Sequence, residues 1–259
     1  MIKTNYHSHT TRCKHAVGSD EAYVLAAIEA GLDEIGFSDH APWPKHPLEE
    51  HFIRMHMDEY NDYVQSILRL KRQYANKIKI RLGLEAEYYE DRMDVLKKFI
   101  DETPLDYVVF GNHFHQLEIN GRYYGRYQKT NQLLEQYEQD SIAGLKTGYY
   151  KIFAHPDLFV RSIKQWDENV ANMSRRIIQC AKDMGVVLEY NLGGIRNFSH
   201  VDLAYPFDPF WDLVAEIGAD VVIGVDAHDP EDFLDFESIA RAEKTLKQKG
   251  IKVLERLSF

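Results

Sequence analysis

Seven short apolar segments, rich in β-branched and aromatic residues, recur along this 259-residue chain, and longer segments with helical patterns separate them. Strands that alternate with helices in this way form parallel sheets through right-handed crossovers. Seven such units favour a closed barrel over an open sheet, and the chain has the usual length of one barrel domain, about 250 residues. We therefore predict an α/β fold with a single domain over residues 1–259. The predicted strands cover residues 2–6, 34–37, 78–84, 107–110, 150–154, 186–190 and 221–225.

Capping residues mark the ends of several predicted helices. Ser19 is a typical N-cap, and Gly31 is a typical C-terminal stop for the helix that follows Ser19. Near the end of the chain, Asp229 is a predicted N-cap and Pro230 takes the first helical position. Gly250 is the predicted end of that same helix.

The chain carries a net negative charge. Its 31 Lys and Arg residues and 41 Asp and Glu residues give a formal net charge of −10. Such a charge repels polyanions, so we expect a small-molecule partner rather than nucleic acid or an acidic membrane surface. The only cysteines are Cys13 and Cys180, and no apolar segment approaches the about 20 residues of a membrane span. We therefore predict a cytoplasmic protein with reduced thiols.

Side chains that bind metals follow almost every predicted strand. Residues i and i+2 of a strand point to the same face, so His7 and His9 can bind one cation. In a parallel barrel the C-terminal ends of all strands open on one face, so distant residues converge there. Two predicted loops, 41–57 and 114–129, would shape the mouth of this site. The residues after the strands are His7, His9, His15, Asp39, His40, Glu85, Glu87, His113, His115, His155, Asp157, Asp226 and His228.

The chemistry of this set indicates a metal centre. His and carboxylate ligands without pairs of Cys suit Zn, Fe or Mn rather than a structural zinc site made of thiolates. The number of candidates exceeds the four ligands of one tetrahedral ion, so we expect more than one ion. Cys13 lies among these histidines in the sequence, but we expect that it is not a ligand.

Two neighbouring pairs leave a choice of ligand. Glu85 and Glu87 point to the same face if their strand continues, but a bend at Gly83 would leave only one of them at the metal. We prefer Glu85. We also prefer His113 to His115, because His113 follows its strand directly.

Other polar residues near these positions have structural interpretations. Asp39 and Asp157 are expected to orient a coordinated imidazole or to cap a helix. His46, His51 and His56 are expected to be hydrogen-bonded residues of a loop.

The same residues resemble a known family. Over essentially the whole chain, the pattern resembles the PHP (polymerase and histidinol phosphatase) family. The His-Ser-His-Thr sequence near the N-terminus and Gly-Phe-Ser-Asp-His-Ala-Pro at 36–42, without an attached polymerase, are similar to the stand-alone histidinol-phosphate phosphatases. The segments that carry the resemblance are His7-Ser8-His9, His15, Asp39-His40, Gly83-Leu84-Glu85-Ala86, His113, His155-Pro156 and Asp226-Ala227-His228.

The resemblance implies a distorted (β/α)7 barrel with three divalent metal ions, Zn, Fe or Mn, at the C-terminal ends of the strands. Glu85 would bridge two of the ions. The Gly-Asn-His sequence at 111–113 differs from the commoner Gly-Ser-x-His, so the assignment of His113 rests on its spacing from Asp106 and Tyr107. The implied ligands are His7, His9, Glu85 and Asp226 for one ion, Glu85, His113 and His155 for the second, and His15, His40 and His228 for the third.

The resemblance further implies hydrolysis of L-histidinol phosphate to L-histidinol and phosphate, a step of histidine biosynthesis. Three divalent ions would outweigh the charges of Glu85 and Asp226, so the pocket would attract a phosphate dianion. A metal-bound hydroxide would attack phosphorus, and Arg161 and Arg196 are placed to bind the phosphate. The predicted catalytic residues are Glu85, Asp226 and His200, and the proton donor could be Asp226, His200 or a metal-bound water.

The organic part of the substrate is named by the resemblance alone. An acidic or aromatic lining near Trp43, Glu49, Tyr88 or Asp157 would suit the amine and imidazole of histidinol phosphate.

Two other functions use similar chemistry. A PHP-type phosphodiesterase or exonuclease acting on nucleotides is disfavoured because the chain lacks a basic stripe interleaved with aromatic residues. A metal-dependent amidohydrolase also begins with His-x-His on a barrel strand, but Glu85 and the terminal Asp226-Ala227-His228 argue against it. A non-catalytic module is disfavoured because such modules usually lack several ligands.

Overall fold

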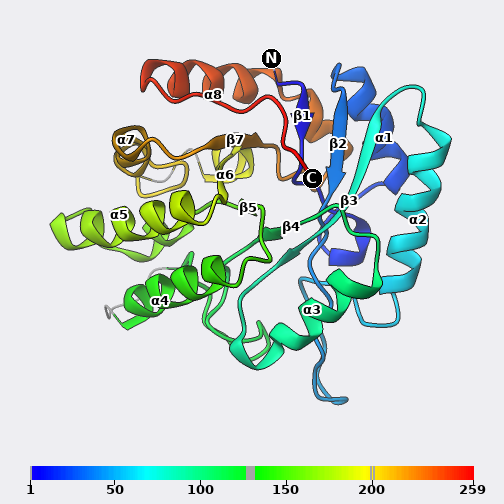
Figure 1. The fold of residues 1–259 in the computed structure, drawn as a ribbon, viewed down its shortest axis with the longest axis horizontal. Coiled ribbons are helices and arrows are strands. Elements are labelled where there is room, and N and C mark those ends of the chain that lie inside the picture. The colour runs from blue at the N-terminus through cyan, green and yellow to red at the C-terminus, as the bar shows by residue number, and fades with distance from the viewer. Residues whose placement is uncertain (1, 127–131, 199, 201) are drawn as a thin grey trace.

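Seven parallel strands form one sheet whose spatial order is the order of the chain, as the computed structural model shows for residues 2–126, 132–198, 200 and 202–259 (Figure 1). A parallel bridge between Ser8 and Ala227 brings the last strand back to the first. The predicted α/β barrel with seven strands is therefore confirmed. The strands are β1 Thr4–Asn5, β2 Glu34–Phe37, β3 Lys79–Ala86, β4 Tyr107–Phe110, β5 Ile152–Phe153, β6 Val187–Asn191 and β7 Val221–Gly224.

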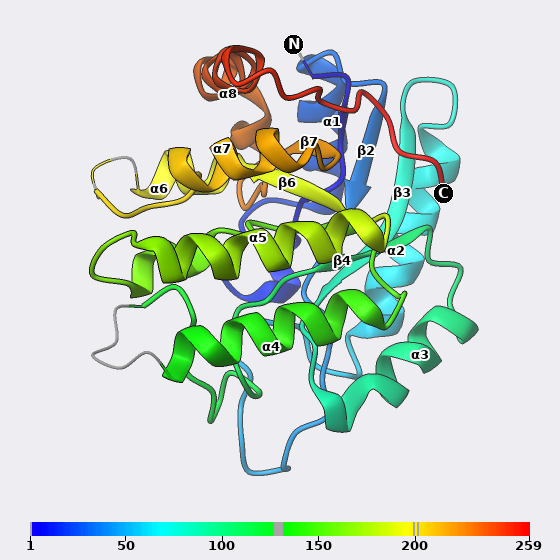
Figure 2. The same ribbon diagram turned by 60° about the vertical axis from the view of Figure 1, so that its left-hand side comes forward.

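Helices cover the outside of the sheet (Figure 2). They alternate with the strands because each apolar helix face packs on the sheet and completes a β-α-β crossover. The α-helices are α1 Asp20–Glu29, α2 Tyr60–Gln73, α3 Met93–Glu102, α4 Gln132–Lys146, α5 Glu168–Asp183, α6 Leu192–Phe198, α7 Asp208–Ile217 and α8 Phe236–Gln248. Short 3₁₀ helices are η1 Thr11–Cys13, η2 Glu90–Arg92, η3 Leu158–Ser162 and η4 Pro230–Leu234.

The predicted cap of the first helix is confirmed, but the prediction for the last helix needs correction. The Ser19 side chain accepts a hydrogen bond from the backbone N–H of Ala22 at the start of α1. Asp229 is the N-cap of the 3₁₀ helix η4 and forms a capping box with Asp232. This short helix ends at Leu234, before the long helix begins. A second N-cap, Asp235, starts α8.

Strand six begins and ends one residue later than predicted, at Val187 and Asn191. The chain turns directly from β6 into α6 at Leu192, so Gly193 and Gly194 lie in a helix. A Cβ at Gly194 would lie 2.2 Å from the backbone oxygen of Tyr205, which explains the need for a glycine there. As a result, Arg196 lies in a helix that directly follows the strand.

Both faces of the sheet are buried, as expected for parallel strands. Every residue of β2, β4 and β7 is buried. Inside the barrel, apolar residues from several strands pack with Leu257 of the C-terminal segment. That segment lies beside β7, since the N–H of Leu254 donates to the backbone oxygen of Val221 at 2.8 Å. The C-terminal segment therefore covers the N-terminal ends of the strands. The C-terminal ends of the strands remain open and can form a binding site.

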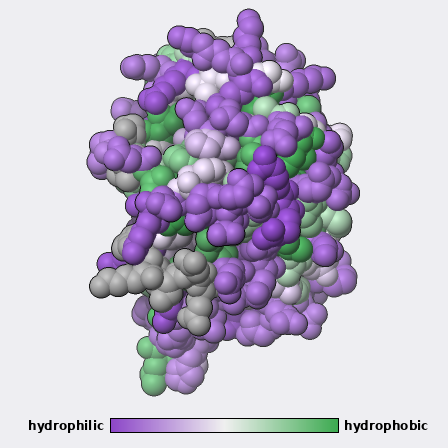
Figure 3. Space-filling view, turned by 90° about the vertical axis from the view of Figure 1, so that its left-hand side faces the viewer, coloured by the Kyte–Doolittle hydropathy of each residue, from purple (hydrophilic) through white to green (hydrophobic). Residues whose placement is uncertain are grey.

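The surface is mostly polar. Figure 3 shows one face that is largely hydrophilic, with small hydrophobic areas between polar side chains. Within the described residues, no helix combines the length and apolar character needed to cross a membrane. Cys13 and Cys180 are free cysteines.

Candidate metal centre

Four side chains from three strand ends converge on one point. The Nε2 atoms of His7 and His9 lie 3.1 Å apart, and the Oδ1 atom of Asp226 lies 3.4 Å from the first and 3.2 Å from the second. The Oε2 atom of Glu85 lies 3.4 Å from His7 Nε2 and 3.6 Å from His9 Nε2. These separations fit the edges of a tetrahedron with metal–ligand bonds of about 2.0–2.2 Å.

A second group uses the other oxygen of the same carboxylate. The Nε2 atoms of His113 and His155 lie 3.2 Å apart, and each is 3.3 Å from Glu85 Oε1. His113 follows β4 and His155 follows β5, so these side chains also come from strand ends. Glu85 thus faces a separate set of imidazoles with each oxygen, which is the geometry of a bridging ligand.

A third group contains only imidazoles. The Nε2 atoms of His15 and His228 lie 3.0 Å apart, and a nitrogen of His40 lies within 4.8 Å of both. His15 follows the 3₁₀ helix η1, which begins four residues after His7. All three residues, together with members of the other two groups, line one pocket of about 710 Å³.

Both oxygens of Glu85 are buried and accept no hydrogen bond within the part of the chain that the structure describes. A buried carboxylate without hydrogen bonds is costly unless a cation compensates its charge. His9 Nδ1 and His40 Nδ1 are likewise buried without a hydrogen bond. The residues present therefore fit divalent cations at this position.

Two of these residues have an unusual backbone conformation. His155 has φ of 32° and Asp226 has φ of 53°, and neither is a glycine. Residues of this kind rarely adopt positive φ, and strained backbone of this sort is concentrated at functional sites. The surrounding fold holds both side chains toward the pocket in spite of this cost.

Glu189 supports the first group from behind, although sequence analysis did not identify it. Its Oε1 atom lies 2.8 Å from His7 Nδ1, and its Oε2 atom accepts hydrogen bonds from the backbone N–H of His155 and from Asn191. A Cβ at Gly224 would lie 1.8 Å from Glu189 Oε1, so the neighbouring strand leaves room for this side chain. The sequence did contain a signal, since Glu189 is the one carboxylate in the apolar segment 186–190.

Asp39 lies beside the histidines as an orienting residue, as expected. It accepts hydrogen bonds from the Thr10 hydroxyl and from the backbone N–H of His40 at 2.8 Å. Its Oδ1 atom lies 3.5 Å from His9 Nδ1. Asp157 instead accepts from the backbone N–H of Phe207 at 2.7 Å and from the Trp211 indole at 3.0 Å.

The structure separates the two pairs that the sequence left open. Glu85 lies in the first two groups, whereas both oxygens of Glu87 bind the Arg54 guanidinium, at 2.8 and 3.0 Å. His113 is buried in the second group. His115 Nδ1 accepts a hydrogen bond from the backbone N–H of Arg122 and faces a different cavity.

Burial and neighbouring charges set the protonation of the imidazoles. Burial lowers the pKa of His40 and of His228 to about 3, so both rings are neutral. Burial also acts to lower the pKa of His9, but Asp226 and Asp39 outweigh it and raise the pKa to about 9. For His113 the carboxylate of Glu85 outweighs burial and raises the pKa to about 10.

The two carboxylates of the centre are anionic. Burial acts to raise the pKa of Glu85, but His113 and His7 outweigh it and hold the pKa well below its ordinary value. The same balance, with His7 as the strongest opposing neighbour, holds the pKa of Asp226 well below its ordinary value. Both residues are therefore available as charged ligands and are poor proton donors.

The predicted phosphate-binding arginines flank the pocket. Arg196 lines it, donates from Nη2 to the backbone oxygens of Val225 and Asp226, and has a buried Nη1 without a hydrogen bond to any described residue. The Arg161 guanidinium lies over the Phe198 ring, 3.6 Å from its centroid, and Phe198 lines the pocket.

The structure does not bring His200 to the pocket. His200 is exposed in the turn after α6 and is not among the described residues that line the pocket. The residues expected near the organic part of the substrate also lie elsewhere. Trp43 and Asp157 are buried in other contacts, and Tyr88 and Glu49 line a separate cavity.

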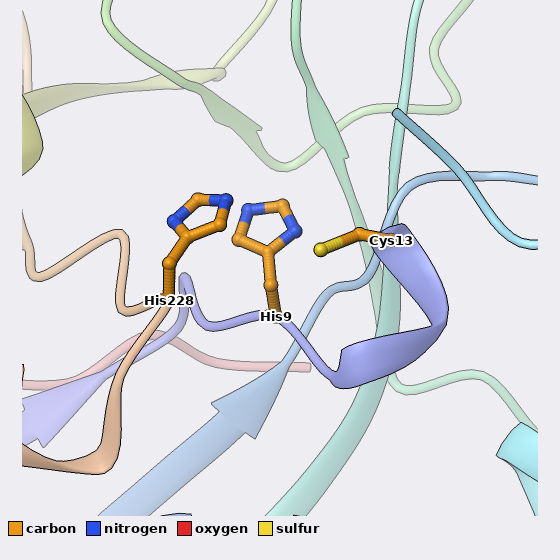
Figure 4. A group of neighbouring side chains, drawn as sticks. All are labelled: His9, Cys13 and His228. Carbon is orange, nitrogen blue, oxygen red and sulfur yellow. The ribbon is translucent and has the colours of Figure 1, made fainter. Parts of the chain in front are cut away.

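Cys13 lies next to the centre. Figure 4 shows the His9 ring between the His228 ring and the Cys13 sulfur, and the three side chains form a group that could hold a metal. Burial, reinforced by the charge of Asp39, raises the pKa of the Cys13 thiol. A neutral thiol is a poor ligand, which favours the three imidazoles of the His15, His40 and His228 group over this one.

Comparisons with known proteins agree with this geometry. The probable histidinol-phosphatase of Deinococcus radiodurans is 27% identical over 237 residues, covering 86% of this chain and 85% of that protein. The histidinol-phosphatase of Bacillus subtilis is 25% identical over 261 residues, covering 90% and 96%. The crystal structure of histidinol phosphate phosphatase from Lactococcus lactis, complexed with zinc, L-histidinol and phosphate, has a TM-score of 0.75 at 22% identity and covers 98% of this chain and 95% of that one.

A family model places the chain more firmly. The model of the PHP domain matches residues 5–192, which is more than half of the sequence. The matched range contains seven of the nine proposed ligands, from His7 to His155, while Asp226 and His228 follow it in the sequence. The chain therefore belongs to the PHP domain family.

Proposed function

We propose that this protein is a metal-dependent phosphomonoesterase that hydrolyses L-histidinol phosphate to L-histidinol and phosphate. The observation that carries the proposal is the convergence of three ligand groups on one pocket, two of which share the buried carboxylate of Glu85. Relatives that align over most of this chain are named histidinol-phosphatase. The similar structure from Lactococcus lactis contains zinc, L-histidinol and phosphate.

Three divalent ions, Zn, Fe or Mn, would occupy the three groups, because imidazole and carboxylate ligands accept all of these metals. When bound, such ions polarise phosphoryl oxygens and lower the pKa of a bound water. The proposed ligands are His7, His9, Glu85 and Asp226 for the first ion, Glu85, His113 and His155 for the second, and His15, His40 and His228 for the third.

Arg196 and Arg161 would bind the phosphate. Arg196 offers the N–H groups of its buried Nη1 atom, which have no partner among the described residues, and guanidinium groups bind phosphate oxygens with forked geometry. Its position is fixed by the hydrogen bonds to the backbone of Val225 and Asp226 and by Asp232, whose Oδ1 atom lies 3.1 Å from Arg196 Nε. The Arg161 guanidinium packs over the Phe198 ring.

The wall of the pocket suits an aromatic leaving group. Phe114, Tyr123, Phe198 and Tyr205 line it together with the proposed metal ligands. Aromatic rings pack well against an imidazole, and the volume of about 710 Å³ lies in the range of small-molecule pockets. These residues replace Trp43, Glu49, Tyr88 and Asp157 as the proposed contacts of the organic part.

A substrate panel tests the proposal. Purified protein, with its metals counted by elemental analysis, is assayed for phosphate release from L-histidinol phosphate, a nucleotide and a phosphodiester, and for hydrolysis of an amide. We expect the largest kcat/KM for L-histidinol phosphate. Absence of phosphate release from protein with full metal content would contradict the proposed function, and faster hydrolysis of the phosphodiester or the amide would favour the alternatives.

A further inference from the structure

A buried arginine lies behind the second ligand group. Arg54 is fully buried in the long loop between β2 and α2. Its guanidinium donates from Nη2 to Glu87 Oε1 at 2.8 Å and from Nη1 to Glu87 Oε2 at 3.0 Å. It also donates from Nη1 to the backbone oxygen of Ala41 at 3.1 Å and from Nε to Glu118 Oε2 at 2.9 Å. A long loop rarely buries a charged side chain so completely without a specific partner.

The network around Arg54 extends through Glu118 to His51. His51 lies 2.6 Å from Glu118 through Nδ1 and 2.7 Å from the backbone oxygen of Trp43 through Nε2. Because both neighbours are acceptors, the ring donates from both nitrogens. Two carboxylates, Glu87 and Glu118, therefore face the guanidinium of Arg54 and the imidazole of His51. Such a closed network can remain charged inside the protein.

Glu87 connects the network to the proposed metal centre. Its Oε1 atom lies 3.2 Å from His113 Nδ1, and the Trp43 indole donates to its Oε2 atom at 2.8 Å. Burial acts to raise the pKa of Glu87, but Arg54 outweighs it and holds the pKa well below its ordinary value. Because Glu87 is an acceptor, His113 Nδ1 donates to it, and Nε2, the nitrogen that faces Glu85 and His155, is the one left to bind a metal.

Arg54 also decides which carboxylate can reach a metal. The ligand atoms of His40, Glu87 and His113 lie close enough to form a metal site of their own. However, the Arg54 guanidinium donates hydrogen bonds to both Glu87 oxygens, and the Trp43 indole donates a further one to Oε2. Glu87 is thereby kept as an orienting partner, whereas the oxygens of Glu85 accept no hydrogen bond from any described residue.

We propose that Arg54 is a positioning residue for the second metal ion, acting through Glu87 on His113. The inference rests on the metal centre of the proposed function and adds to it a role for the loop at residues 41–57. Arg54 does not touch the ion or the substrate. It fixes the carboxylate that sets the orientation and the proton position of one ligand, and partners of this kind typically change metal affinity about 10- to 100-fold.

Zinc affinity, measured on metal-stripped protein against a chelator that buffers free zinc, tests the proposal. We expect Glu87→Gln and Arg54→Met each to bind one zinc ion about 10- to 100-fold more weakly than the wild type, while the other ions bind as before. If Arg54 acts through Glu87, the double variant binds zinc no more weakly than Glu87→Gln alone.

Glu118→Gln is the matched control. Glu118 is the other buried carboxylate of the network, and its described contacts are with Arg54 and His51. We expect it to lower the melting temperature about as much as Glu87→Gln and to leave zinc affinity unchanged. Equal zinc affinity in Glu87→Gln and the wild type, or an equal loss in Glu118→Gln, would overturn the inference. Because turnover is not the readout, neither result depends on whether L-histidinol phosphate is the substrate.

Discussion

The absence of a side chain at position 111 lets two ligands of the centre approach each other. A Cβ on Gly111 would lie 2.3 Å from Glu85 Oε1 and 2.5 Å from His113 Cε1. Both distances are far below van der Waals contact, so a side chain at this position would displace one or both of these buried groups. At the scale of single residues, the metal centre therefore depends on its ligands and also on a neighbouring glycine, Gly111, whose missing side chain leaves room for them.

Gly111→Ala is expected to reduce the bound metal from three ions to one and to abolish most of the phosphatase activity, because Glu85 and His113 must move apart. Elemental analysis and phosphate release measure the two effects. Gly31→Ala is the control, since Gly31 has φ of +77° with nothing near its Cβ position. We expect this control to lose about 1–2 kcal/mol of stability and to keep its metals. Full metal content in Gly111→Ala would contradict the account of this position.

Glu189→Gln is expected to weaken binding of the first ion about 10- to 100-fold, because Glu189 orients His7 through Nδ1. The measurement is zinc affinity against a buffered chelator. The control is Glu243→Gln, a substitution in α8, outside the described lining of the metal pocket. Unchanged zinc affinity in Glu189→Gln would show that His7 does not need this partner.

The sequence could predict which side chains converge at the centre and the orienting position of Asp39, but not the positions of Glu189 and Arg54. His7, Glu85 and Asp226 directly follow or end apolar strands, and the geometry of a parallel barrel brings such positions together. Glu189 was missed because it lies within a strand, where its orientation depends on the register with β7. Arg54 was missed because no periodic pattern exists in its loop, so its burial depends on contacts made by distant segments.

At the scale of elements, the direct turn from β6 into α6 places Arg196 over the pocket. The sequence indicated a phosphate-binding arginine after strand six but did not predict the helix that carries it. The same limit affected the last helix, where Asp229 was a correct N-cap of a shorter element. Local capping patterns predict where a helix begins, whereas its length depends on packing across the fold.

Arg161→Ala is expected to lower kcat/KM about 10- to 100-fold with unchanged metal content, because a hydrogen bond to a charged group contributes about 1.5–3 kcal/mol. Arg196→Ala is expected to lower kcat/KM by at least as large a factor, since Arg196 also donates hydrogen bonds to the backbone oxygens of Val225 and Asp226. Steady-state kinetics with L-histidinol phosphate measure both. Unchanged kcat/KM in both variants would rule out the phosphate-binding role.

At the scale of the whole molecule, metal binding is coupled to proton release. The pKa of His9 is raised to about 9 and that of His113 to about 10, so both rings are protonated at pH 7 in the metal-free protein. Each must lose its extra proton to coordinate a metal. Metal binding therefore replaces the extra protons of these two ligands.

Zinc affinity is therefore expected to rise between pH 7 and pH 10, and the number of protons released on binding is expected to fall over the same range. Calorimetric titration in buffers of different ionisation enthalpy measures the released protons. Binding enthalpies at pH 7 that do not depend on the buffer would contradict this coupling.

Stepwise return of metal to the metal-free protein tests the central claim most directly. Zinc is added in known equivalents, and phosphate release from L-histidinol phosphate is measured after each addition. The account predicts no release without metal and an increase that ends at three equivalents per chain. Phosphate release that is already complete in the metal-free protein, or that reaches its maximum at one equivalent, would contradict it.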